Sequence, residues 1–122
     1  MKPSKFPSTL QSLGAGDASL RFNDGGMGPY TSPVRYFAAN GYALYDMAGN
    51  VHQWCWDWYD SGYYGWSPGI DPRGPTSGSY RVYRGGSWGY DAVDCRAANR
   101  GYDLPALRYY YLGFRSVLSP GQ

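Results

Sequence analysis

Hydrophobic and polar residues alternate most clearly in the middle of the chain, between Val51 and Tyr59. One side of this segment carries His52, Trp54, Trp56 and Trp58, and the other carries Val51, Gln53, Cys55, Asp57 and Tyr59. A period of two residues predicts a β-strand. Because buried tryptophans remove large apolar areas from water, we expect the tryptophan side to form the main wall of the core.

Shorter patterns predict three more strands, over Tyr80–Trp88, Arg96–Arg100 and Leu112–Leu118. Glycine, proline and serine are frequent between residues 62 and 79, which predicts a long loop. A short helix over Pro7–Leu13 is the one helical candidate, and residues 22–30 have the composition of a turn. Together these elements predict a small antiparallel sheet with long irregular loops and little helix.

The composition supports one irregular domain. The chain has 122 residues, which favours a single domain over residues 1–122, and its 18 glycines, 9 prolines and 14 tyrosines are typical of a loop-rich fold. With a net charge of +2 and no cluster of Lys and Arg, a nucleic-acid partner is not expected. No apolar run reaches the roughly 20 residues that a membrane span needs, so membrane insertion is not expected either.

Residues 1–17 lack the apolar centre and cleavage site of a signal peptide, so the sequence does not predict a cellular location. Display on a virion or a cell surface, as part of a larger assembly, is one option.

Residues 84–115 combine two kinds of position. We interpret the first kind as a structural framework of glycines, arginines and residues of buried type. It comprises Arg84, Gly85, Gly86, Ser87, Trp88, Cys95, Arg96, Ala97, Ala98, Asn99, Arg100, Pro105, Arg108, Gly113, Phe114 and Arg115. The arginines could also form a patch for an acidic ligand, but we expect them to hold loop carbonyls and aspartates in place.

The intervening positions mix tyrosine, small residues and aspartate with no period of 2 or 3.6, so they cannot all be core. Three consecutive tyrosines cannot all point the same way, and tyrosine offers rigid contact area in antibody loops. We therefore predict a ligand-binding face. Its residues are Gly89, Tyr90, Asp91, Val93, Asp94, Gly101, Tyr102, Asp103, Leu104, Ala106, Leu107, Tyr109, Tyr110 and Tyr111.

Three segments resemble a known family: NGYALYDMAGNVHQWCWDWY, DPRGPTSGSYRVYRGGSW and CRAANR…P…R…LGFR. They resemble the formylglycine-generating-enzyme and sulfatase-modifying-factor domain, a variant of the C-type lectin fold, over about residues 31–115. The resemblance implies an α+β, C-type lectin-like fold in which residues 1–30 are a shortened amino-terminal segment.

Within that family, residues 84–115 are most similar to the variable proteins of diversity-generating retroelements. In those proteins Asn codons are mutated at adenines, and such codons with a pyrimidine third base cannot encode Lys, Glu, Gln, Met or Trp. None of these five residue types occurs between Gly89 and Leu112. The resemblance implies a non-enzymatic domain with a hypervariable face for a macromolecular ligand, most simply a protein.

Two alternatives stay open, a formylglycine-generating oxidase and a purely structural domain of the same family. Formylglycine-generating enzymes use two cysteines to bind copper. The resemblance puts Cys95 near the second cysteine but Tyr90 near the first, so we expect no enzyme and no copper. His52 has no carboxylate or cysteine at ligand spacing and is expected to be a packing or surface residue rather than a metal ligand.

Calcium is a weaker candidate, implied by the match of Asn50 to a family calcium position. The family's acidic ligand three residues later is Gln53 here, which removes a charge that a hard cation prefers. We favour the simpler interpretation, that Asn50 is a turn residue after Gly49. Cys55 and Cys95 could form one disulfide or stay as two free thiols, depending on the redox compartment.

Overall fold

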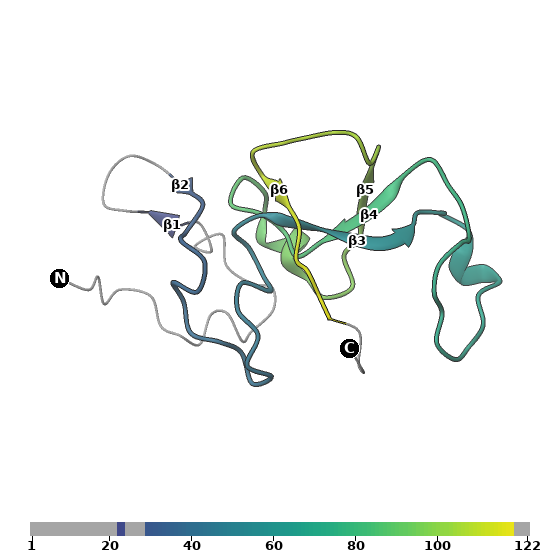
Figure 1. The fold of residues 1–122 in the computed structure, drawn as a ribbon, viewed down its shortest axis with the longest axis horizontal. Helices are drawn as coiled ribbons and strands as arrows, with labels where there is room; N and C mark the ends of the chain where they lie inside the picture. Colours follow the sequence, from purple (N-terminus) through teal and green to yellow (C-terminus); the bar gives the residue numbers. More distant parts are fainter. Residues whose placement is uncertain (1–21, 24–28, 119–122) are drawn as a thin grey trace.

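The computed structural model describes residues 22–23 and 29–118. At its centre is a four-stranded sheet of order β5-β4-β3-β6 (Figure 1). Its strands are β3 (His52–Trp58), β4 (Arg81–Arg84), β5 (Gly101–Asp103) and β6 (Leu112–Gly113). A separate pair joins β1 (Phe22–Asn23) to β2 (Pro29–Tyr30), where the sequence predicted a turn.

The central sheet is mixed. Strand β4 runs antiparallel to β3 and to β5, as predicted, but β6 runs parallel to β3, with His52 opposite Leu112. The connection from β5 to β6 arches over the sheet and brings the chain to the far side of β3 in the same direction as that strand (Figure 1). The expectation of a wholly antiparallel sheet is therefore wrong for this one pair.

Helix is scarce in the described residues, as predicted. Only two 3₁₀ turns occur there, η3 (Tyr63–Gly65) and η4 (Ala92–Cys95). No helix in that part of the chain has the length and apolar character to cross a bilayer. The predicted helix over Pro7–Leu13 lies outside the described residues.

Two predicted strands are misplaced. Residues 96–100 form a turn in which the Asn99 amide donates to the carbonyl of Asp94, and pairing with β4 begins only at Gly101. Only the first two residues of the segment 112–118 pair with β3. Both errors have one cause, since the short strands here are set by where a partner strand lies and not by their own apolar pattern.

The core is small, and its buried residues lie on both faces of the sheet. Val82 is completely buried, and His52, Ser87, Tyr63 and Cys95 are each at most 5% exposed. The predicted tryptophan wall is only partly correct, because Trp56 is 88% exposed. The pairing of β3 with β4 is irregular between Trp54 and Trp58, so the inward and outward alternation of side chains does not continue along the strand.

Glycines hold the turn after β4 against η4. Gly85 and Gly86 both have positive φ angles, +96° and +69°, which other residues adopt at a cost. A Cβ atom at Gly86 would lie 3.1 Å from the Cα of Cys95 and closer still to its sulfur. The buried Cys95 therefore fixes where the loop that follows Gly86 leaves the sheet.

Candidate ligand-binding face

Two of the predicted variable loops meet over the first residue of β3. One loop carries Tyr90 and leaves the sheet after Trp88. The other carries Tyr109, Tyr110 and Tyr111 and leads into β6. The backbone N–H of His52 donates to the carbonyl of Tyr111 over 2.8 Å. This hydrogen bond continues the parallel pairing of β3 and β6 and fixes the second loop to the sheet.

The tyrosine rings of these loops and that of Tyr83 on β4 form one aromatic group. We call it the tyrosine cluster (Tyr83, Tyr90, Tyr109, Tyr110 and Tyr111). Tyr109 and Tyr111 stack with ring centroids 4.9 Å apart, and Tyr90 and Tyr110 meet the edge or face of Tyr111 at 5.3 and 5.1 Å. A hydrogen bond between the hydroxyls of Tyr90 and Tyr111 is the main cause that raises the pKa of Tyr111. Tyr110 is 76% exposed and Tyr90 37%, so the cluster has an open outer surface.

His52 lies beneath the cluster and is 3% exposed. Its ring centroid is 4.7 Å from that of Tyr83 and 4.8 Å from that of Tyr90. Neither ring nitrogen has a hydrogen-bond partner among the described residues. Burial lowers the pKa of His52, against a smaller opposing effect of Asp94. The imidazole is therefore a neutral packing residue, in agreement with the sequence-based expectation.

Carboxylates lie close to the cluster. Burial raises the pKa of Tyr83, and Tyr90, Asp103, Asp94 and Tyr109 raise it further. Asp94 and Asp103 form no ion pair with any of the residues 22–23 and 29–118. The tyrosine cluster is thus an aromatic surface with a negative border.

Tyr102, which the sequence assigns to the same face, lies apart from this cluster. In β5 it pairs with Val82, so its side chain leaves the sheet on the side opposite to Tyr83. There it stacks on Tyr59 at 3.8 Å and meets the edge of Tyr80 at 5.4 Å. The structure therefore divides the predicted tyrosines between two aromatic groups.

The other predicted positions differ in exposure. Those that lie open to solvent are Gly89, Asp91, Val93, Leu104 and Ala106, and those that are half-buried are Asp94, Gly101, Asp103 and Leu107. Gly101 has no room for a side chain, because a Cβ atom there would overlap the ring of Tyr83. Gly101 behaves as a framework residue.

Most framework arginines contact carbonyl, hydroxyl or carboxylate groups of the protein itself, as predicted. Arg100 pairs with Asp57 and donates to the Tyr64 hydroxyl, so it ties the chain before β5 to β3 and to η3. Arg96 donates to the carbonyl of Val93 over 2.9 Å, and Arg115 donates to the carbonyl of Tyr45. Arg84 and Arg108 are exposed and donate no side-chain hydrogen bond within the described ranges.

Two hydrophobic framework residues differ from each other. Trp88 is half-buried and its ring lies 5.6 Å from that of Tyr110. Phe114 is 80% exposed, so its expected place in the core is wrong. The strand ends at Gly113, one residue earlier, and no partner strand turns Phe114 inward.

The cysteines do not fit a two-thiolate copper site. Both are free thiols, with Cys95 buried beneath Gly86 and Cys55 half-buried on β3. Burial raises the pKa of both thiols, which disfavours the thiolate that copper requires. Tyr90, which the resemblance aligns with the other copper ligand, instead hydrogen-bonds Tyr111.

The calcium candidates already have other partners. The Asn50 side chain accepts from the N–H of Ser32 and donates to its carbonyl, and the residue has a φ of +63°, as a turn residue does. The Gln53 side chain donates to the carbonyl of Asp46 and accepts from Arg115. A guanidinium beside Gln53 opposes a divalent cation there.

The sequence-based prediction missed Tyr83, which joins the cluster from β4. It did place His52 on the same side of β3 as Trp54, the side expected to pack in the core. No local pattern indicated Tyr83, because its position in the cluster depends on the pairing of β3 with β4.

Comparison with known proteins agrees with the family resemblance. The model of the sulfatase-modifying factor enzyme 1-like domain matches residues 7–120, and the chain belongs to this family. The formylglycine-generating enzyme of Streptomyces coelicolor is 43% identical over 88 residues, which are 70% of this chain and 28% of that protein. The serine/threonine-protein kinase pkn1 of Chlamydia caviae is 46% identical over 87 residues, 70% of this chain and 14% of that protein.

Solved structures place the fold. Treponema denticola variable protein 1 superimposes with a TM-score of 0.65 and 38% identity, covering 91% of this chain and 37% of that one. PvdO from Pseudomonas aeruginosa gives a TM-score of 0.64 and 29% identity, covering 77% of this chain and 36% of that one. The chain thus has the C-type lectin-like fold that its motifs implied, and it spans well under half the length of these relatives.

Proposed function

We propose that this protein is a non-enzymatic ligand-binding domain, the variable protein of a diversity-generating retroelement. Residues 1–122 would form its single domain and residues 84–115 its variable region. The similarity to Treponema denticola variable protein 1, at 38% identity over 91% of the chain, supports this assignment. So does the lack of a two-thiolate site at Cys95 and Tyr90, which argues against the oxidase alternative.

The tyrosine cluster is the observation that carries the proposal. Its exposed rings pack on the buried side chain of His52, and their backbone is hydrogen-bonded to the sheet. Rigid tyrosines of this kind give a large contact area for little loss of conformational entropy, and they are frequent among the residues that dominate protein interfaces. Residues at the surrounding positions can be substituted without altering the packing on His52, since most of their side chains lie outside the core.

The ligand would be a macromolecular surface, and a protein rather than a nucleic acid. Asp94 and Asp103 lie close to the tyrosines, and Asp91 lies exposed in the loop that carries Tyr90, so these carboxylates would repel phosphate groups. The same carboxylates favour a protein surface that carries some positive charge.

The nucleotide sequence around the gene tests the proposal. We expect a near-copy of the region that encodes Gly89 to Tyr111, differing from it at adenines and lying close to a reverse-transcriptase gene. If the surrounding sequence contains neither the copy nor the reverse transcriptase, the retroelement assignment is wrong.

A further inference from the structure

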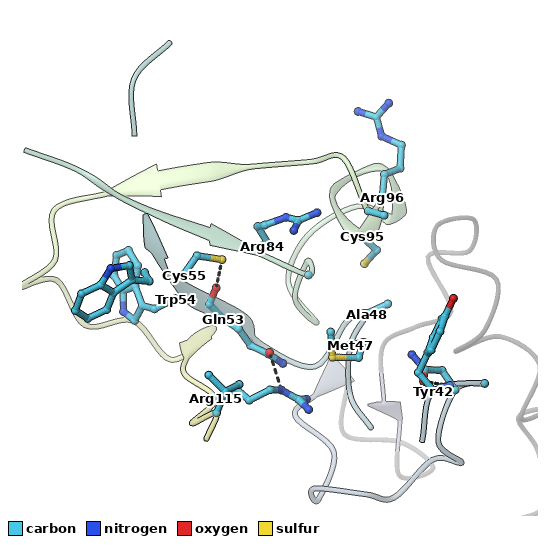
Figure 2. Close-up of a pocket in the computed structure, with 16 residues that line it drawn as sticks. Tyr42, Met47, Ala48, Gln53, Trp54, Cys55, Arg84, Cys95, Arg96 and Arg115 are labelled. Carbon is cyan, nitrogen blue, oxygen red and sulfur yellow. Dashed lines mark hydrogen bonds between the residues drawn. The ribbon is translucent and has the colours of Figure 1, made fainter. Parts of the chain in front are cut away.

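A second hollow lies on the other side of the sheet from the tyrosine cluster. It has a volume of about 780 Å³, and Gln53, Cys55 and Arg84 are among the residues that line it (Figure 2). On β3 the side chains of Gln53 and Cys55 point away from the side on which His52 meets the tyrosines. This hollow is therefore a separate surface from the proposed variable face.

Large apolar side chains border the hollow without being covered. Trp56 is 88% exposed, Tyr42 87% and Val117 83%, and Met47 lies between them with 42% exposure. A group of exposed large apolar residues around one concave surface is typical of an interaction site.

The hollow is also positively charged. Arg84, Arg96 and Arg115 line it, whereas none of its lining residues is Asp or Glu (Figure 2). Arg96 and Arg115 donate only to neutral groups, the carbonyls of Val93 and Tyr45 and the side chain of Gln53. Arg84 has neither an ion pair nor a side-chain hydrogen bond within 22–23 and 29–118. The Arg96 side chain points away from the hollow, so the guanidinium groups of Arg84 and Arg115 are the charges that border it (Figure 2).

The hollow continues into a second one of about 410 Å³, and the two share Gln53 and Arg115. The exposed Phe114 and Val34 line this extension, together with one carboxylate, Asp46, and one further arginine, Arg35. A continuous groove of this kind suits an extended polypeptide better than a compact small molecule.

We propose that this groove binds an acidic polypeptide segment, whose carboxylates meet Arg84 and Arg115 and whose apolar side chains cover Trp56 and Tyr42. The partner is a separate polypeptide. Residues 1–21 carry Lys2, Lys5 and Arg21 against Asp17, so their charge does not match the groove.

Fluorescence anisotropy with labelled peptides tests the proposal on the full chain. The probes are a peptide that alternates Glu and Leu, a peptide of the same length that alternates Lys and Leu, and a peptide of residues 1–21. We expect only the Glu-Leu peptide to bind, more weakly as salt increases. Arg84→Gln and Arg115→Gln should each weaken it about fivefold, as the loss of one charge contact does. Arg73→Gln is the matched control, because Arg73 is exposed and pairs only with Asp71 outside the groove.

Several outcomes would overturn the proposal. Equal binding of the acidic and basic peptides, or equal effects of Arg84→Gln and Arg73→Gln, would show that the arginines do not select the ligand. Binding of the residue 1–21 peptide would identify the chain's own segment as the occupant. Sedimentation of the protein alone as a dimer that Arg84→Gln dissociates would identify a second copy. Far-ultraviolet circular dichroism shows whether each variant is folded, and Arg115→Gln provides the test if Arg84→Gln does not fold.

Discussion

Acidification should destabilise this protein through one residue, His52. Its pKa in the folded state lies below the ordinary value of 6.5, because burial among tyrosine rings disfavours the charged imidazole. Above pH 6.5 the imidazole is neutral in both the folded and the unfolded chain. As the pH falls through 6.5, the unfolded chain takes up a proton that the folded chain does not. The stabilising effect of the neutral ring is therefore present above 6.5 and is lost below it.

The size of the effect follows from proton linkage. Between the two pKa values, the free energy of unfolding should fall at a rate approaching about 1.4 kcal/mol per pH unit. A domain of this kind has about 5 to 15 kcal/mol in total, so a loss of this size is easily measured. Carboxylates ordinarily titrate near pH 4, so the window from about pH 7.5 to 5.5 reports mainly on histidine. His52 is the only histidine in the chain.

Urea unfolding at several pH values across this window provides the measurement, with His52→Phe as the control. Phenylalanine keeps an aromatic ring under Tyr83 and Tyr90 but cannot take up a proton. We expect the slope with pH in the wild type and its loss in the variant. An equally steep pH dependence in His52→Phe, or none in the wild type, would refute the assignment of a buried neutral imidazole.

Three further predictions concern the framework, the tyrosines and the chemistry. Phe114→Ala should change the free energy of unfolding by less than about 0.5 kcal/mol, whereas Val82→Ala should lower it by about 2 kcal/mol because it opens a cavity in the core. Chemical denaturation measures both values, and similar losses in the two variants would contradict the exposure of Phe114. Tyr110→Ser should hardly change the free energy of unfolding, but Tyr111→Ser should lower it by about 1 to 3 kcal/mol, since it removes a stacked ring and a hydrogen bond. An unchanged free energy of unfolding in Tyr111→Ser would show that the cluster does not stabilise the loop. The purified protein should form no formylglycine in a cysteine-containing peptide, with or without copper. If mass spectrometry detects formylglycine and Cys95→Ser abolishes it, the oxidase hypothesis is correct instead.

The sequence predicted the parts of the fold that depend on local pattern. The strand over residues 52–58, the shortage of helix and the structural role of Arg96, Arg100 and Arg115 could all be deduced from residue types and spacing. The family resemblance supplied the C-type lectin-like fold, which periodicity alone could not.

What could not be predicted depends on pairing between distant segments. Trp56 fits the apolar alternation of β3, but the irregular register with β4 leaves it exposed. Tyr102 resembles the other tyrosines in sequence, yet its register opposite Val82 directs it to the other side of the sheet. Membership of the proposed ligand-binding face is thus decided by strand register, and composition does not contain that information.

The contact between Gly101 and Tyr83 would limit which sequences the proposed diversification could sample. A side chain at position 101 would displace the Tyr83 ring, and that ring packs on His52, so the change would reach the core. Position 110 has no such restriction, because its side chain is largely in solvent. Among naturally occurring variants of this gene, codon 101 should remain glycine after selection for folding, while codon 110 should vary freely. The number of variants that fold would then be smaller than the number of mutable codons suggests.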